Sequence, residues 1–216
     1  MQPPVIYLHG FASGPGSSKA RIFRSRLAER GIPVEVPDLN EGGFENLTLS
    51  GQLHVIERVA GGRPVSLIGS SMGGYLAALY AARHPEVDRL VLMAPAFCFA
   101  RRWAEMLGSA RLEHWRATGR LDVFHYGCGE TRSVGWRLME DARQFEDFPQ
   151  LRQPVLIFHG AEDTVVPPSL SEDFAGGRSN VRLRLLRSDH QLLDCIEGIC
   201  EEAGVFLGAS EPVRAS

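Results

Sequence analysis

The stretch GSSMG at residues 69–73 lies between an apolar run at 65–69 and a helical pattern at 72–84. A Gly-X-Ser-X-Gly sequence between a strand and a helix is typical of a very tight turn, which holds the central serine hydroxyl out at the carboxyl edge of a sheet. Ser71 occupies the central position, and the competing hydroxyl of Ser70 is expected to point away from the exposed apex. Ser71 is therefore the candidate nucleophile.

The two glycines of this turn, Gly69 and Gly73, are predicted to be required by crowding. Each lies two residues from Ser71, where such a turn brings neighbouring backbone too close for a side chain. The helix that begins at Met72 also aims its free N–H groups and the positive end of its dipole toward the serine.

Apolar runs like the one before Ser71 recur along the chain. They are rich in Val, Ile and Leu without strict alternation, as expected for parallel strands covered on both faces. Helical patterns separate most of them, which predicts an α/β fold with a doubly wound, mainly parallel sheet. The predicted strands cover 5–9, 33–37, 65–69, 89–93, 155–159 and 181–186, and the predicted helices lie between Ser17 and Gly31, at 47–60, at 72–84 and from Leu192 to Ala203.

The interval between Ala96 and Pro154 breaks this alternation, because it contains no run that is typical of a strand. The interval is too long for a bare loop in a compact domain, and its pattern indicates helices near 99–117 and 131–147. We interpret residues 97–148, called the insertion below, as a helical cap over one edge of the sheet.

The composition is that of an ordinary globular protein: 216 residues, 44% of them apolar, with a net charge of −3. We expect a single domain over residues 1–208 and a flexible tail at 209–216. The low net charge argues against nucleic acid as a partner. Lys19 is the only lysine among the 23 basic residues, which we interpret as coding bias.

No part of the chain reaches the roughly 18 uninterrupted apolar residues that a membrane span needs. The N-terminus lacks the basic region and cleavage site of a signal peptide, so we expect a cytoplasmic protein. The four cysteines show no CxxC spacing, and neither a metal-ligand cluster nor a phosphate-binding glycine pattern is present. We therefore expect no metal and no cofactor.

A serine hydroxyl needs a base that takes its proton during attack. In this topology the order along the chain is serine, acid, histidine, and His190 follows the last predicted strand on a loop at the same edge as Ser71. His114 and His125 lie in the insertion and would have to reach the site from above, whereas His159 ends a strand inside the sheet and is interpreted as structural. His190 is the candidate base.

The acid that orients this histidine is expected on the loop after the preceding strand, where Glu162 and Asp163 are available. Asp163 is preferred because a tight turn and an apolar Val-Val-Pro segment would hold its carboxylate rigidly. Asp189 neighbours His190, but adjacent residues seldom aim their side chains at each other. A carboxylate from Asp163 would fix the tautomer of the imidazole and stabilise the imidazolium.

Charge on a tetrahedral intermediate requires two N–H donors. The amide of Met72, directly after the nucleophile, is one candidate. The loop after the first strand has the sequence His-Gly-Phe, and there the amide of Phe11 is the second candidate because Gly10 permits the required turn.

With these residues placed, the chain resembles the α/β-hydrolase superfamily. The segments YLHGFASGPGSSKA, LIGSSMGGYLAA, FHGAEDTVVP and SDH are most similar to the small bacterial YqiA-like esterases, and also to a related mitochondrial group of serine hydrolases. The resemblance implies a minimal α/β-hydrolase fold, a catalytic triad of Ser71, Asp163 and His190, and an oxyanion hole from Phe11 and Met72. It is poor in the insertion and implies no particular substrate.

The sequence thus predicts a serine carboxylic-ester hydrolase that acts through an acyl-enzyme on small or short-chain acyl esters. Acyl thioester hydrolysis, on acyl-CoA or acyl-protein, uses the same machinery and stays open. A non-catalytic ligand-binding module of the same fold is the alternative from another class, although such modules usually lose a triad member. A small-molecule ester or thioester is the expected partner, and the sequence leaves a homodimer open.

Charge is unevenly distributed in the insertion. Up to Arg120 it has five arginines and two acids, and beyond Arg120 it has three arginines and six acids. One hypothesis is that the basic half lies near the mouth of the pocket and favours anionic substrates. The alternative is an ordinary solvated surface with pairing between the halves.

Overall fold

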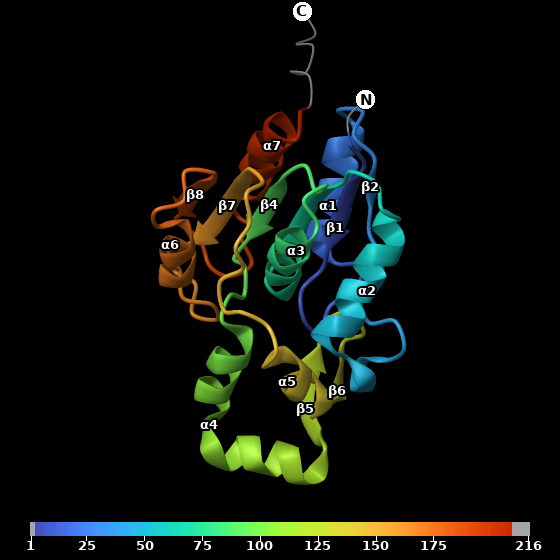
Figure 1. The fold of residues 1–216 in the computed structure, drawn as a ribbon, viewed down its shortest axis with the longest axis vertical. Helices are drawn as coiled ribbons and strands as arrows, with labels where there is room; N and C mark the ends of the chain where they lie inside the picture. Colours follow the sequence, from blue (N-terminus) through green and yellow to red (C-terminus); the bar gives the residue numbers. More distant parts are fainter. Residues whose placement is uncertain (1–2, 209–216) are drawn as a thin grey trace, which may run out of the picture.

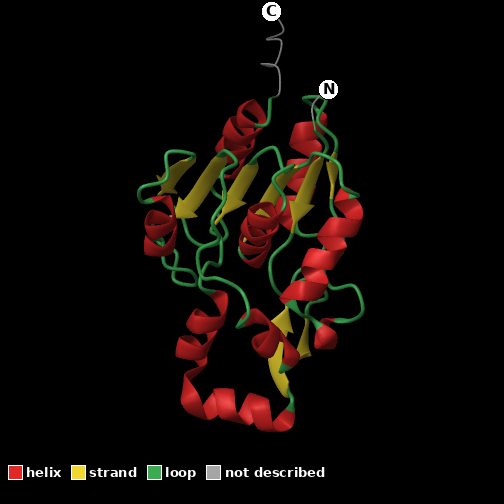
Figure 2. Ribbon diagram, viewed as in Figure 1, coloured by secondary structure: helices red, strands yellow, loops and turns green. Residues whose placement is uncertain are grey.

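A computed structural model describes residues 3–208, so the tail predicted at 209–216 lies outside the described residues. Its centre is a six-stranded sheet in the order β2-β1-β3-β4-β7-β8, with every neighbouring pair parallel. Figure 2 shows this sheet as one layer between helices. The strands are β1 (Val5–Leu8), β2 (Val34–Glu35), β3 (Ser66–Ser70), β4 (Leu90–Met93), β7 (Val155–Gly160) and β8 (Val181–Leu186).

The central strands are buried on both faces, which explains their continuous apolar sequence. Along β1, Val5 and Tyr7 face one apolar cluster and Ile6 and Leu8 face another. The first cluster includes residues of α1 and α7, and the second includes residues of α2, α3 and the insertion (Figure 1). The predicted strands and the doubly wound α/β class are confirmed.

The helices that cover the sheet follow the predicted pattern. Ser17 caps the first of them, because its hydroxyl accepts a hydrogen bond from the amide of Ala20. A short helix between β7 and β8 was not predicted, since seven residues are too few for a helical period to be recognised. Leu192 and Leu193 were assigned to the last helix but precede it. The helices are α1 (Ser18–Ala28), α2 (Leu49–Ala60), α3 (Met72–Arg83), α6 (Ser169–Ala175) and α7 (Ile196–Phe206), with a 3₁₀ turn at Phe44–Asn46.

The insertion lies beyond the carboxyl ends of the strands (Figure 1). It contains α4 (Phe99–Thr118), β5 (Arg120–His125), β6 (Glu130–Gly135) and α5 (Arg137–Ala142). The predicted helix near 99–117 is present, bent at Gly108 where φ is +69°. The absence of strands was a wrong prediction. Of the helix predicted near 131–147, only Arg137–Ala142 is helical, because the residues before it form β6.

The missed element is an antiparallel hairpin of β5 and β6. Its strands carry exposed polar residues such as Asp122 and Arg132, so they lack the apolar run of a buried strand. The alternating pattern of LDVFH and the turn glycines Gly127 and Gly129 were the available signals.

The three tryptophans of the insertion pack one against the next within it. Trp115 is fully buried, packs edge-on against Trp136, and donates a hydrogen bond from its indole nitrogen to the carbonyl oxygen of Val134 at 3.0 Å. Trp103 packs edge-on against Phe11, which lies on the loop after β1. The insertion is therefore attached by aromatic contacts to a loop that borders Ser71.

Within residues 3–208, no helix combines the length and the apolar character that crossing a membrane would demand.

Candidate active site

Ser71 lies in a strained turn between β3 and α3, with φ 54° and ψ −118°. Non-glycine residues seldom adopt positive φ, and such strain collects at functional sites. The carbonyl oxygen of Ser71 accepts hydrogen bonds from the amides of Gly74 and Ala96, and its own amide donates to the carbonyl oxygen of Met93. These contacts hold the backbone so that the hydroxyl stands at the carboxyl edge of the sheet.

The glycines around the turn are needed for close approach of backbone. A Cβ on Gly73 would overlap the carbonyl oxygens of Leu8 and His9, and a Cβ on Gly69 would overlap the backbone of Gly73 and Gly74. Overlap with backbone cannot be relieved by a side-chain rotation. The crowding predicted from the Gly-X-Ser-X-Gly spacing is thus present on both sides of Ser71.

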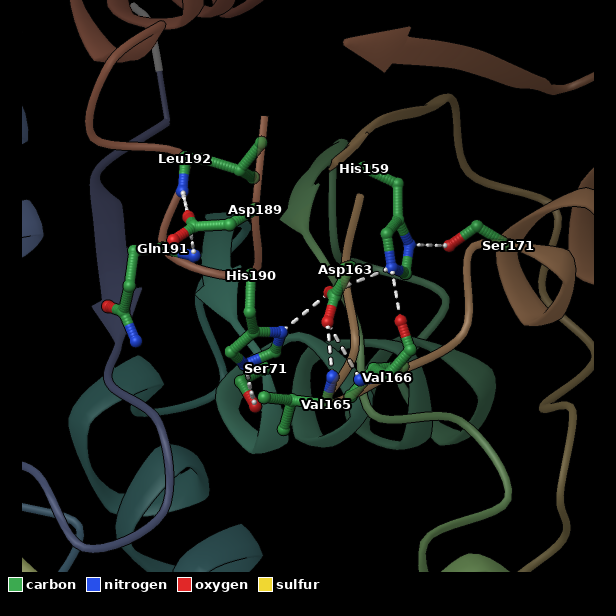
Figure 3. Close-up of polar contacts among 10 residues, drawn as sticks. All are labelled: Ser71, His159, Asp163, Val165, Val166, Ser171, Asp189, His190, Gln191 and Leu192. Carbon is green, nitrogen blue, oxygen red and sulfur yellow. Dashed lines mark hydrogen bonds and ion pairs between the residues drawn. The ribbon is translucent and has the colours of Figure 1, made fainter. Parts of the chain in front are cut away.

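Three side chains from separate loops form one chain of hydrogen bonds (Figure 3). The Ser71 hydroxyl lies 3.1 Å from Nε2 of His190, and Nδ1 of His190 lies 2.7 Å from Oδ2 of Asp163. Because the carboxylate can only accept, His190 carries its proton on Nδ1 and leaves Nε2 free to accept from the serine. The structure therefore brings together the three residues that the sequence singled out.

The loops after β7 and β8 meet because Gly160 has no side chain. A Cβ there would overlap the carbonyl oxygens of Ser188 and Asp189. The carboxylate of Asp189 accepts hydrogen bonds from the amides of Gln191 and Leu192, so it shapes the His190 turn and faces away from the imidazole (Figure 3).

Glu162, the other candidate acid, is exposed and lies 3.7 Å from the guanidinium of Arg187. It makes no contact with His190, whereas the side chain of Asp163 is fully buried against it.

Asp163 is held by donors on both carboxylate oxygens. Oδ1 accepts from the amides of Val165 and Val166 at 2.8 and 2.9 Å, and Oδ2 accepts from His190 and His159. Burial raises the pKa of Asp163, but the hydrogen bonds from His159, His190 and Val166 outweigh burial and hold the pKa well below its usual range. The carboxylate is therefore ionised and ready to stabilise an imidazolium.

His159 is the functional side chain that sequence reasoning undervalued. Its Nε2 lies 3.1 Å from Oδ2 of Asp163 and 2.9 Å from the carbonyl oxygen of Val166, and its Nδ1 lies 2.7 Å from the hydroxyl of Ser171. The carbonyl accepts only, so Nε2 carries the proton and Nδ1 accepts from Ser171. The structural role predicted for His159 thus includes orienting the Asp163 carboxylate. In the sequence, the spacing His159-X-X-X-Asp163 was the signal that could have indicated this contact.

Removing the donor from His159 should lower turnover without removing the triad. We expect His159→Leu to reduce kcat on the order of 10- to 100-fold, the cost of one hydrogen bond to a charged acceptor. His159→Gln, whose amide can donate to Asp163, should recover most of this loss. Steady-state kinetics on a neutral ester measures both variants, and equal activity in His159→Leu and the parent protein would show that backbone amides alone hold Asp163.

The amides of Phe11 and Met72 are the two candidate oxyanion donors. Both residues line the cavity that contains Ser71, and no acceptor within residues 3–208 takes a hydrogen bond from either amide. A Cβ on Gly10 would lie 3.4 Å from the Cβ of Ser71, so the loop after β1 passes directly beside the serine. Free amides next to a nucleophile are the geometry of an oxyanion hole.

The remaining candidate side chains lie apart from this chain of hydrogen bonds. Ser70 is buried and also lines the cavity, but within residues 3–208 it forms no hydrogen bond with His190. His125 lines the cavity, but its ring packs against Phe44 and its Nδ1 contacts the sulfur of Cys128 at 3.1 Å.

Ser71 opens into a cavity of about 1170 Å³ between the sheet edge and the insertion. Most of its lining surface is apolar, and a few charged side chains also line it. Such a cavity is at the upper end of the usual range for small-molecule sites. The lining includes Phe11, Phe97, Phe99, Trp103, Val166 and Leu170, and at the mouth the exposed side chains of Met106, Tyr126, Val165 and Leu193.

The parallel sheet, the strained serine turn and the three joined side chains define an α/β-hydrolase. This confirms the class inferred from the sequence. Residues 4–199 match the model of the uncharacterised protein family UPF0227, and the chain belongs to that family.

Parts of the chain are similar in sequence to known proteins. The acylamino-acid-releasing enzyme of Rattus norvegicus is 30% identical over 139 residues, which are 60% of this chain and 18% of the relative. The human monoacylglycerol lipase ABHD6 is 30% identical over 131 residues, which are 52% of this chain and 38% of the relative. The chain therefore spans well under half the length of these curated relatives.

Among solved structures, the mouse alpha/beta hydrolase domain-containing protein 10 superposes with a TM-score of 0.80 at 20% identity, covering 97% of this chain and 92% of the other. A likeness at this level of identity supports the fold alone.

Proposed function

We propose that this protein is a serine hydrolase that cleaves carboxylic esters through an acyl-enzyme. The observation that carries the proposal is the continuous set of hydrogen bonds from Ser71 through His190 to Asp163, with Ser71 and His190 in the lining of the cavity. The matches to a monoacylglycerol lipase and to an esterase for pimeloyl-[acyl-carrier protein] methyl ester support ester chemistry as the reaction class.

In the acylation half, the Ser71 oxygen attacks the ester carbonyl carbon while Nε2 of His190 takes the hydroxyl proton. The carbonyl oxygen becomes an oxyanion that accepts hydrogen bonds from the amides of Phe11 and Met72. Asp163 stabilises the imidazolium. When the tetrahedral intermediate collapses, the bond to the leaving oxygen breaks and His190 returns its proton to that oxygen.

In the deacylation half, water takes the place of the leaving alcohol. His190 removes a proton from this water, the resulting oxygen attacks the acyl-serine carbonyl, and the second oxyanion uses the same two amides. Collapse releases the carboxylic acid and returns the proton to Ser71. The side chains of this chain account for every proton that moves.

The volume of the cavity indicates how large a substrate it can hold. Short acyl chains were predicted from the small size of the protein, but about 1170 Å³ is more than a short acyl ester requires. We therefore propose that the cavity holds a small acyl group together with a bulky leaving group.

The test is hydrolysis of 4-nitrophenyl butyrate combined with labelling by phenylmethylsulfonyl fluoride. We expect release of 4-nitrophenol, loss of activity on labelling, and a mass increase confined to the peptide that contains Ser71. Activity that survives complete labelling, or a label at another residue, would overturn the assignment of the nucleophile. Lack of any turnover with this ester and with the matched butyryl thioester would favour a non-catalytic binding module.

A further inference from the structure

The cavity beside Ser71 carries an excess of positive charge. Its lining includes the basic side chains of Lys19, Arg21, Arg102 and Arg132, and Asp38 is the acidic residue among the lining residues described. The two arginines from the insertion have partners: Arg102 lies 3.6 Å from Glu105, and Arg132 lies 3.4 Å from Glu45. Arg102, from the basic half of the insertion, and Arg132, from its acidic half, are thus both paired with glutamates.

Lys19 and Arg21 differ from these arginines. Within the part of the chain that the structure describes, neither side chain forms an ion pair or a hydrogen bond. Both come from the first turn of α1, directly after the loop that carries Phe11. The cavity's basic side chains that form no direct ion pair in the described chain therefore lie at the beginning of α1.

A lysine at this place is unfavourable for the fold. Lys19 is the second residue of α1, where a cation opposes the helix dipole. Burial lowers the pKa of Lys19 to about 8, against the opposing effect of the Asp189 and Asp163 carboxylates. Neither helix propensity nor a direct ion pair within residues 3–208 explains a half-buried cation at this position, where the only carboxylates that raise its pKa are those of Asp189 and Asp163.

The amino-acid composition also indicates a specific role for Lys19. Every basic residue of the chain except Lys19 is an arginine, so the bias of the sequence favours arginine at each basic position. A compact ammonium, which binds anions as a point charge, differs from the planar guanidinium in reach and hydration. The earlier interpretation of this lysine as coding bias explains the arginines but leaves Lys19 itself unexplained.

The position of Lys19 indicates which part of the substrate it would contact, the acyl group or the leaving group. Lys19 lines the cavity together with His190 and Gln191 of the turn after β8, and the carboxylates of Asp189 and Asp163 raise its pKa against the effect of burial. His190 must deliver its proton to the leaving group, which places the leaving group beside this turn. Apolar side chains such as Phe97 and Leu170 remain for the acyl group.

We infer that Lys19 is a specificity-determining residue that binds an anionic group, carboxylate or phosphate, on the leaving group of the ester or thioester. The inference rests on the proposed hydrolase function and names its substrate class. Arg21 adds charge at the same end of the cavity, and Asp38 is kept from competing because its carboxylate is engaged by the amide of Asn40.

The experiment compares kcat/KM for 4-acetoxybenzoate, which carries a carboxylate on the leaving group, with that for its neutral methyl ester. We expect the parent protein to prefer the anionic ester. Lys19→Met should reduce that preference about tenfold to a hundredfold, as for loss of one charge-assisted interaction, and Lys19→Arg should keep part of it. Arg24→Met is the matched control, because Arg24 is exposed on the same helix outside the cavity, and it should leave the preference unchanged.

The preference should also depend on pH. With a pKa near 8, the ammonium is charged below that pH and neutral above it, so the preference should decline between pH 7 and 9. The other ionisable groups that face Lys19 are Arg21 on α1, Asp38 after β2, Asp163 after β7, and Asp189 and His190 after β8. Taking the ratio of the two esters cancels the common requirement for His190, and Lys19→Arg should keep its preference to higher pH.

Three results would count against the inference. An unchanged preference in Lys19→Met removes the role of Lys19. The second result concerns the acyl side: Lys19 is needed for a preference for mono-4-nitrophenyl glutarate, whose acyl group is anionic, over 4-nitrophenyl pentanoate, and there is no preference for 4-acetoxybenzoate. This result would place the anion on the acyl group and overturn the leaving-group assignment. The third result comes from calorimetry and needs no turnover. If 4-hydroxybenzoate binds the parent protein and Lys19→Met with equal affinity, Lys19 forms no anion site, even if the protein hydrolyses none of these esters.

Discussion

Ser71→Ala should abolish ester hydrolysis, with kcat falling by at least about 10⁴-fold, because the oxyanion donors and binding alone recover only a small part of a triad's rate enhancement. The reason is chemical: no other hydroxyl lies within hydrogen-bonding distance of Nε2 of His190 in the described chain. Turnover of 4-nitrophenyl butyrate at matched protein concentration measures the effect, and circular dichroism verifies that the variant is folded.

Ser70→Ala is the matched control for this substitution. Ser70 is the adjacent serine and is buried, but the hydroxyl within hydrogen-bonding distance of His190 is that of Ser71. We expect Ser70→Ala to cost some stability and to keep most of the activity. The reverse result, an inactive Ser70→Ala and an active Ser71→Ala, would show that the wrong hydroxyl was chosen.

His190→Ala should lower kcat by at least about 10³-fold, since without a base the serine proton has no acceptor in the transition state. The midpoint of thermal unfolding should change little. Asp163 keeps its bonds from Val165, Val166 and His159, so the substitution leaves no buried carboxylate without a donor. A thermal melt beside the kinetic assay separates a loss of chemistry from a loss of fold.

His54→Ala provides the comparison for His190→Ala. His54 is exposed on α2 and lies outside the cavity, and its removal should leave kcat unchanged. If His190→Ala retains near-parental activity, another base operates, and His159 is excluded from that role because both of its nitrogens are already engaged. His125 would then be the histidine to substitute next.

The fold was readable because its main signals are local. Runs such as VIYL in β1 and VLIFHG in β7 are buried on both faces, so their apolar character is continuous and unmistakable. The hairpin of the insertion was missed for the opposite reason. Residues such as Asp122 and Phe124 are exposed there, and the alternation of a half-exposed two-stranded ribbon covers only a few residues, which is a weaker signal than a continuous apolar run.

The candidate nucleophile, acid and base were predicted from the sequence because a tight glycine-flanked turn and the ends of parallel strands constrain where side chains can point. What the sequence by itself determined about this protein is therefore its class and its candidate triad residues. Only the tertiary structure decided that the ring of His159 is turned toward Asp163 and that Lys19 lines the same cavity as the His190 turn. His159 and Asp163 are four residues apart, but the contact with Ser171 on α6 fixes the direction of the ring. Lys19 and His190 meet at one cavity because elements far apart in the chain pack together, and residue spacing does not encode the distances and directions that packing sets.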